Sequence, residues 1–175
     1  NSALGSGTFN ISGNSGVSAY GSDLTLANLT YFNTGSLGFS GNYNITFSGT
    51  FIHNGGNRDL YNNLSTGKTL TISGPTYLMD PLTAQANRQL SVWGTGTTEF
   101  KGSIANGTPT PLTASGTLNV GSAVILSASN SFAGGIVVQT GGLVLLNNAN
   151  ALSSGSLSFS GGAFDNITGA PMSVS

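Results

Sequence analysis

The sequence predicts an all-β fold, a parallel β-helix (solenoid) of roughly seven coils that forms a single domain over residues 1–175. Helix signals are almost missing, because turn-forming residues interrupt the chain every few positions and no window carries an apolar stripe at helical spacing. Most segments instead alternate apolar and small polar residues, as strands do when one face is buried. A five-residue phrase also recurs along the chain. Such repetition favours stacked coils over the alternative of a sandwich or an up-and-down barrel.

The recurring phrase has apolar residues at its first and third positions and glycine at its fifth. Its copies are FNISG (9–13), LGFSG (37–41), ITFSG (45–49), LTISG (70–74), LSVWG (90–94) and LSFSG (157–161). The first and third side chains are predicted to point into the core, and the second and fourth to point outward and hydrogen-bond along the stack. The glycine is predicted to supply the positive φ of a corner.

The intervals between phrases predict the length of a coil. The clearest phrases begin at residues 45, 70, 90, 118, 143 and 157. We interpret the first four intervals, of 25, 20, 28 and 25 residues, as one coil each, and the last, of 14 residues, as half a coil. The variation is expected to lie in the turns.

Strands are expected wherever the alternation is clear. They cover residues 8–12, 24–32, 42–52, 69–74, 89–94, 117–129, 135–146 and 156–161. Turns are expected at NGG (54–56), NG (106–107), GG (134–135, 141–142 and 161–162) and at Pro75, Pro81, Pro109 and Pro111. The C-terminal PMSVS (171–175) reads as one more apolar strand, without a charge or a turn to cap it.

Composition narrows the class of protein. Gly, Ser, Thr and Asn make up 91 of the 175 residues, but 38% of the chain is hydrophobic and only 5% is charged, which argues against disorder. Four basic residues against five acidic ones leave no basic stripe, so no nucleic-acid partner is expected. No apolar run approaches the roughly 18 residues of a membrane-spanning helix.

Cysteine is absent, which excludes disulfides and thiolate metal sites. A chain that begins at Asn1 is expected to be a processed protein or an excised piece.

The region from residue 112 onward resembles the autotransporter-associated β-strand repeat of bacterial surface proteins. The matching residues are Gly116, Leu118, Val120, Asn130, Phe132, Gly134, Gly135, Val138, Gly141, Leu143, Leu145, Ala151, Leu152, Gly155, Leu157, Gly161 and Gly162. We therefore divide the chain into a clear repeat unit (112–175), degenerate coils (61–111) and a divergent end or cap (1–60). The resemblance implies a right-handed β-helix that is exported and displayed at the bacterial cell surface or outside it, and it implies no catalytic residues.

Two groups of polar residues are candidate catalytic sites. His53, Arg58 and Asp59 lie close together in the sequence, but the surrounding HNGGN segment favours a wide turn. Asp80 and Glu99 lie near one coil and would have to stack at glycosidase spacing. We expect no catalytic residue, no metal site and no cofactor, and the protein is predicted not to be an enzyme.

Trp93 is predicted to point outward, because it occupies the fourth position of its phrase, where most other copies carry Ser. With Tyr77 nearby it would offer a surface on which a sugar ring stacks. We favour the other interpretation, that the long 75–89 segment covers the indole.

The ends of the predicted solenoid suggest its function. We expect a non-enzymatic extracellular structural protein, a stalk, adhesin segment or filament subunit, whose partner is itself, head to tail. The self-association residues would be Phe9, Ile11, Met172 and Val174, and removal of residues 170–175 is expected to weaken association. The alternative is a β-helix that binds or cleaves carbohydrate, with surface glycans as partners.

Overall fold

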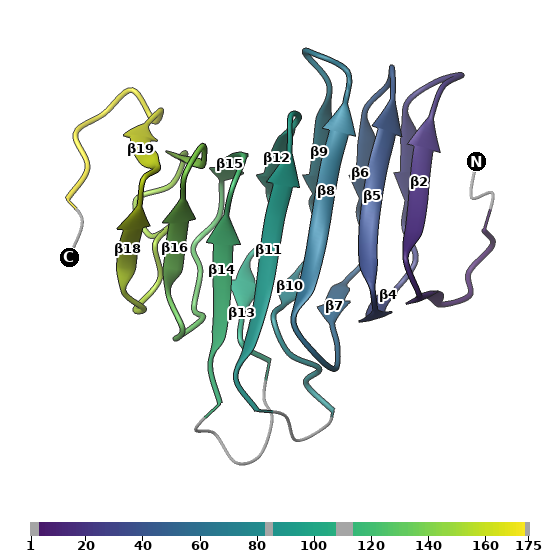
Figure 1. The fold of residues 1–175 in the computed structure, drawn as a ribbon, viewed down its shortest axis with the longest axis horizontal. Coiled ribbons are helices and arrows are strands. Elements are labelled where there is room, and N and C mark those ends of the chain that lie inside the picture. Colours follow the sequence, from purple (N-terminus) through teal and green to yellow (C-terminus); the bar gives the residue numbers. More distant parts are fainter. Residues whose placement is uncertain (1–3, 83–85, 108–113, 174–175) are drawn as a thin grey trace.

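The chain folds into a solenoid of parallel strands. The computed structural model describes residues 4–82, 86–107 and 114–173, and within these ranges it contains strands and turns but no helix. The strands form three sheets that run along the molecule (Figure 1). All strand pairs within the sheets are parallel.

Each sheet takes every third strand of the early coils, in chain order. Sheet A consists of β1 (Phe9–Ser12), β4 (Thr30–Thr34), β7 (Phe51–His53), β10 (Thr76–Tyr77) and β13 (Ile104–Ala105). Sheet B consists of β2 (Ser15–Ala19), β5 (Ser36–Gly41), β8 (Arg58–Leu64), β11 (Arg88–Gly94), β14 (Gly116–Val120), β16 (Ile136–Gln139) and β18 (Leu157–Ser160). Sheet C consists of β3 (Leu24–Leu26), β6 (Ile45–Phe47), β9 (Thr69–Ile72), β12 (Thr97–Phe100), β15 (Ala123–Leu126), β17 (Leu143–Leu146) and β19 (Ala163–Asn166).

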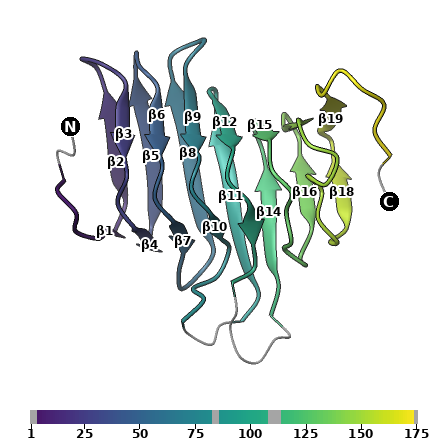
Figure 2. The same cartoon turned by 180° about the vertical axis from the view of Figure 1, so that it is seen from behind.

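The chain visits sheets A, B and C in turn, and the seven strands of sheets B and C define seven coils. In Figure 1 the chain rises along sheet B on the near side, descends along sheet C behind it and advances toward the C-terminal end, which makes the coil right-handed; Figure 2 shows the same path from behind. The predicted parallel β-helix of roughly seven coils is therefore confirmed. In coils 6 and 7 the segment that would continue sheet A forms no strand.

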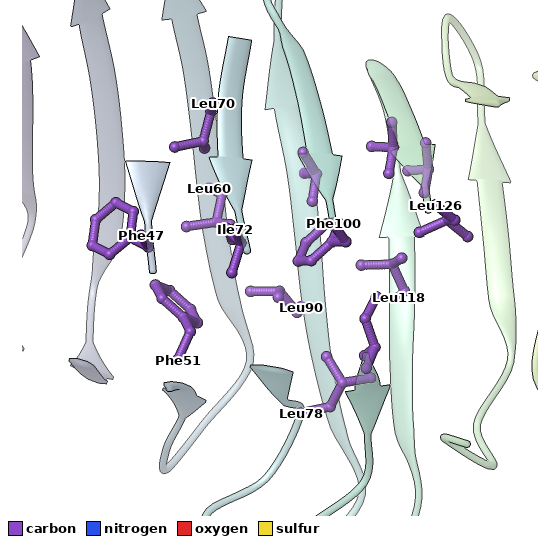
Figure 3. Close-up of a cluster of buried hydrophobic side chains, with 14 of the residues drawn as sticks. Phe47, Phe51, Leu60, Leu70, Ile72, Leu78, Leu90, Phe100, Leu118 and Leu126 are labelled. Atoms are coloured by element: carbon purple, nitrogen blue, oxygen red, sulfur yellow. The ribbon is translucent and has the colours of Figure 1, made fainter. Parts of the chain in front are cut away.

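The core is a narrow column of side chains that all three sheets supply. Figure 3 shows Phe51 from sheet A, Leu60 from sheet B and Ile72 from sheet C pointing toward one another. All three are fully buried. Each coil places its apolar residues on the same columns as the coil before it, so that burial at roughly 25 cal/mol per Å² accumulates along the axis.

The phrase predicts the direction of its side chains correctly but not its place in the coil. Leu70 and Ile72 are buried, as the first and third positions should be. However, the copies are spread over three walls: FNISG in sheet A, ITFSG and LTISG in sheet C, and the remaining three in sheet B. Of the five intervals, only 45 to 70 and 90 to 118 join residues that pair with each other. The prediction that the 20-residue interval and the second 25-residue interval are single coils was wrong. All three sheets face the core and need the same alternation of apolar and polar residues, so the phrase occurs in more than one sheet of the solenoid.

The glycines that close the phrases serve two different purposes. Gly41 and Gly94, at the ends of strands of sheet B, have φ of 119° and 111°, the left-handed region predicted for a corner. These two glycines also approach the preceding coil closely, since a Cβ on Gly41 would lie 2.1 Å from the carbonyl oxygen of Ala19. Gly74, after a strand of sheet C, has no positive φ, so close approach is its sole requirement of the two. A Cβ on Gly74 would lie 2.0 Å from the carbonyl oxygen of Gly49 in the preceding coil. The corner after sheet C therefore requires close approach of two backbones.

Asparagine side chains replace strand hydrogen bonds at the corners. The Oδ1 atoms of Asn14, Asn57 and Asn87 accept from the backbone N–H groups of Ser36, Gln89 and Ser115 in the next coil, at 2.9, 3.0 and 2.9 Å. The fully buried Asn62 donates from Nδ2 to the Thr97 carbonyl at 2.8 Å and accepts at Oδ1 from the Leu64 N–H at 3.1 Å. These bonds satisfy backbone groups that the corners remove from the ladders, which explains the high asparagine content.

The C-terminal segment departs from the sequence prediction. Pro171, Met172 and Ser173 form no strand, and Val174 and Ser175 lie outside the described residues. Figure 1 shows the chain leaving β19 and continuing past the last coil. Met172 is half-buried and packs against the core. At this end residues 168–173 therefore lie where a further coil would stack.

Candidate functional site

The polar segment around His53 is a turn between β7 and β8. The imidazole of His53 is fully buried, and its Nε2 donates to the carbonyl oxygen of Gly56 at 2.7 Å. Burial, with a smaller contribution from the charge of Arg58, lowers the pKa of His53 to about 4, so the ring is neutral at neutral pH. The Arg58 guanidinium donates to the Asn33 carbonyl. This geometry agrees with the predicted wide turn.

Asp59 is not paired with His53. Its carboxylate points to the outside of sheet B and accepts from the indole Nε1 of Trp93 at 3.0 Å. Asp80 and Glu99 belong to the same coil but lie on different walls. Asp80 is buried after β10 and accepts from the Leu82 N–H at 2.9 Å, whereas Glu99 lies on β12.

Asp59, Asp80 and Glu99 therefore lie on three different sides of the solenoid. Glu99 accepts from the Ser127 hydroxyl at 2.7 Å, a contact along the stack. In the part of the chain that the structure describes, no three His, Asp or Glu side chains are grouped closely enough to hold a metal ion.

Trp93 does point outward, but Tyr77 is not beside it. Tyr77 belongs to β10 in sheet A, whereas Trp93 belongs to β11 in sheet B. The aromatic residue beside Trp93 is its register partner Tyr61, whose side chain is 41% exposed. The sequence could not reveal this pair, because an unusually long connection places the two residues 32 positions apart.

The indole of Trp93 spans three coils. Its nitrogen is bonded to Asp59 in coil 3, and its six-membered ring covers Gly121 in coil 5, where an added Cβ would lie 1.9 Å from the ring. The hydrogen bond and the glycine together fix the orientation of the ring on the outer face of sheet B.

The C-terminal end exposes apolar side chains that belong to core columns. Phe159 on β18 and Phe164 on β19 are 46% and 44% exposed, and their ring centroids are 5.7 Å apart. Ile167, immediately after β19, is 43% exposed. In earlier coils the residues of these columns are buried, because the next coil covers them. The free edges of β18 and β19 also present unpaired backbone groups.

The N-terminal end contains an apolar hollow. Its volume is about 220 Å³, and the residues that line it are Leu4, Phe9, Gly16, Val17, Leu24 and Leu26. The free edges of β1, β2 and β3 surround it. The two ends therefore differ in shape, because the C-terminal end presents a pair of exposed aromatic rings and the N-terminal end presents the hollow.

The predicted self-association residues agree only in part with these surfaces. Phe9 lines the hollow, whereas Ile11 is buried in the core. Met172 is half-buried, and Val174 lies outside the described residues. The sequence interpretation missed Phe159 and Phe164. For Phe159 the available signal was its core-facing third position in LSFSG (157–161), since a core-facing residue is exposed when no coil covers it.

Comparison with family models, with curated proteins and with solved structures finds no match to this chain. Among the described residues, no helix is long and apolar enough to cross a membrane.

Proposed function

We propose that this chain is a non-enzymatic structural protein of the bacterial exterior, a β-helical stalk, adhesin segment or filament subunit that associates end to end. The observation that carries the proposal is the contrast between the ends and the middle of the solenoid. Interior coils bury the columns that Phe159 and Phe164 extend, while the terminal coils leave apolar side chains and strand edges uncovered.

The physical chemistry of these ends favours association. Uncovered strand edges offer backbone donors and acceptors in the right spacing for another parallel strand. The net charge of −1 provides little repulsion between copies. Because one end carries rings and the other a hollow, the contact is head to tail, and repeated head-to-tail contacts generate filaments when the rotation does not close.

The extracellular location rests on the sequence. A cysteine-free chain with few charges and abundant Asn, Ser, Thr and Gly is typical of bacterial surface proteins, and the resemblance of residues 112–165 to the autotransporter-associated repeat supports the same location.

The test is the state of the full chain in solution and on the microscope grid. We expect sedimentation to reveal concentration-dependent multimers, and negative-stain images to show rods longer than one seven-coil unit. Phe164→Asp should abolish both. Tyr61→Asp is the matched control, because Tyr61 is also an aromatic strand residue of similar exposure, 41% against 44%, but lies in the middle of the solenoid. A Phe164→Asp chain that forms rods as the parent does would contradict the proposal.

A second candidate function is glycan binding on the outer face of sheet B. The supporting observation is that Tyr61 and Trp93 lie side by side in register, with the indole held by Asp59. Aromatic rings on a flat surface stack on the apolar face of a sugar. Trp93→Ala should lower affinity for a bound polysaccharide at least ten-fold, while Tyr77→Ala, on another wall, should not.

The carbohydrate-cleaving version of this candidate has its own test. If polysaccharide cleavage is detected and survives both Asp80→Ala and Glu99→Ala, these two acids are not its catalytic residues. Absence of cleavage by the parent chain rules this version out.

A further inference from the structure

We infer that the ends join in one particular register, with β19 of one copy alongside β3 of the next and Phe164 directly beside Leu24. This inference rests on the proposed end-to-end association and specifies its partner surface as a second copy of this chain. The columns of inward side chains determine which apolar residues of each end need a neighbour.

One column of inward-facing side chains in sheet C has an apolar residue at each end. In register order, it consists of Leu24, Ile45, Leu70, Thr98, Val124, Val144 and Phe164. The five interior members are fully buried. The column begins with a half-buried Leu24 on the rim of the hollow and ends with an exposed Phe164. A second copy placed in continuous register would cover Phe164 with Leu24 and bury both.

The hollow has the size that this contact needs. At about 220 Å³ it is larger than an engineered cavity of about 150 Å³ that binds a benzene molecule. Its lining by Leu4, Phe9 and Val17 is apolar. The phenyl ring of Phe164 therefore finds both space and apolar contacts in the hollow of the next copy.

Sheet B continues in the same register with one imperfect contact. The column that ends at Phe159 passes through Val138, Val120, Val92, Leu60 and Leu37 and begins with Ser15. Stacking would thus place Phe159 beside a serine whose hydroxyl bonds to the Gly13 carbonyl at 3.3 Å. The contact in sheet B is weaker than the contact in sheet C, but no charge is buried by it.

Segments at both ends occupy the same corner, so one of them must leave. Residues 4–7 precede β1, and Asn28 holds them by donating from Nδ2 to the carbonyls of Gly5 and Gly7 at 3.1 and 2.5 Å. Residues 168–173 follow β19 and form no sheet bonds with the last coil. Among the residues that the structure describes, the Ala170 carbonyl accepts from the nearby Asn166 and Thr168, at 2.7 and 3.1 Å. The C-terminal segment is therefore the one expected to move aside, at the expense of the Met172 contact.

Disulfide trapping tests the register in a chain that has no cysteine of its own. With Phe164 beside Leu24, the outward neighbours Asp165 and Thr25 face each other across the junction. Adjacent strands lie about 4.8 Å apart, within the Cα separation of about 4.4–6.8 Å that a disulfide spans. The Thr25→Cys/Asp165→Cys chain should form a ladder of covalent multimers on a non-reducing gel.

Two cysteine variants serve as controls for the register and for the head-to-tail direction. Ala27 is also exposed but lies two residues further along, which lengthens the Cα separation to about 8 Å and prevents the bond. Ala27→Cys/Asp165→Cys should therefore yield at least ten-fold less multimer. Asp165→Cys alone should yield none.

The outcomes separate the register from the proposed function. If the parent chain multimerises but the Ala27 variant forms the ladder, the register is wrong and end-to-end association stands. If Asp165→Cys alone forms dimers, two C-terminal ends meet and the head-to-tail contact is refuted. If the parent chain sediments as a monomer at every concentration and no variant links, the proposed function fails together with the register.

Discussion

Replacing Gly74 with alanine should open the stack between two coils. The added Cβ would lie 2.0 Å from the Gly49 oxygen, 2.5 Å from the Gly49 carbonyl carbon and 2.9 Å from the Ser48 oxygen. Real Cβ atoms do not approach closer than about 3 Å, so the coils must separate locally by roughly 1 Å. All three atoms are backbone, and no side-chain rotation relieves the clash.

The energy of that separation follows from the neighbouring contacts. Three hydrogen bonds converge on the Phe47 carbonyl, from the N–H groups of Ser73 at 2.8 Å and Gly74 at 3.3 Å and from the Ser73 hydroxyl at 3.3 Å. Loss of such a bond costs about 1 kcal/mol, or about 1–3 kcal/mol when a buried group is left unpaired. A gap of about 0.5–1 Å also removes a quarter to a half of the dispersion energy between the coils. We expect a loss of about 4 kcal/mol, a large part of a stability of roughly 5–15 kcal/mol.

The assay is urea unfolding followed by far-ultraviolet circular dichroism. With an m-value of about 2 kcal/mol per M, the midpoint of Gly74→Ala should fall by roughly 2 M. Gly13→Ala is the control, because no atom lies within 4 Å of its added Cβ and its φ is not in the left-handed region. This control should stay within about 0.5 kcal/mol of the parent. Equal midpoints for the two variants would refute the close-approach explanation of the sheet C corner.

Four further predictions concern stability and association. The pKa of His53 is about 4 in the folded protein and 6.5 in the unfolded chain, so between these pH values the unfolded state binds more protons. The free energy of unfolding should therefore fall by about 3 kcal/mol as the pH drops from 7 to 4. His53→Gln should remove most of this pH dependence, as measured by thermal melts at several pH values. Asn62→Leu removes the partner of a part-buried carbonyl and of a buried N–H and should cost about 2–5 kcal/mol by urea titration, whereas Asn63→Leu, exposed on the same strand, should cost less than about 0.5 kcal/mol. Ser15→Val should tighten association measured by sedimentation equilibrium, since it gives Phe159 an apolar neighbour at the junction; unchanged affinity would count against the sheet B contact. Removal of residues 168–175 should strengthen association rather than weaken it, reversing the expectation from the sequence; a weaker or absent multimer would mean that this segment is part of the contact.

Side-chain direction was predictable wherever the alternation was clear. Leu70 and Ile72 point inward and Trp93 points outward because period-two alternation is a local property of a strand. The corner role of Gly41 was predictable for the same reason, since a positive φ is a demand of a single residue. The requirement at Gly74 was not, because the atoms that exclude a side chain there come from Gly49, in another coil.

Neighbours across coils could not be read from the sequence. The offset between paired residues ranges from 18 positions, for Val120 with Val138, to 32 positions, for Leu60 with Val92. A turn can lengthen without changing the strands that it joins, and the alternation of apolar and polar residues within a strand does not depend on the length of the turn. The aromatic pair on sheet B, and the position of LSFSG in the seventh coil, therefore became visible only in the folded chain.

By itself the sequence determined that the chain forms short strands with one buried face, that glycine and asparagine occupy its corners, and that these strands stack as a solenoid. These properties depend on residues within one strand or one turn. Only the tertiary structure decided which wall each phrase joins, which glycines permit close approach of two coils, and which apolar side chains the last coil leaves exposed. Those properties arise from contacts between coils, whose register depends on the accumulated lengths of all the turns between them.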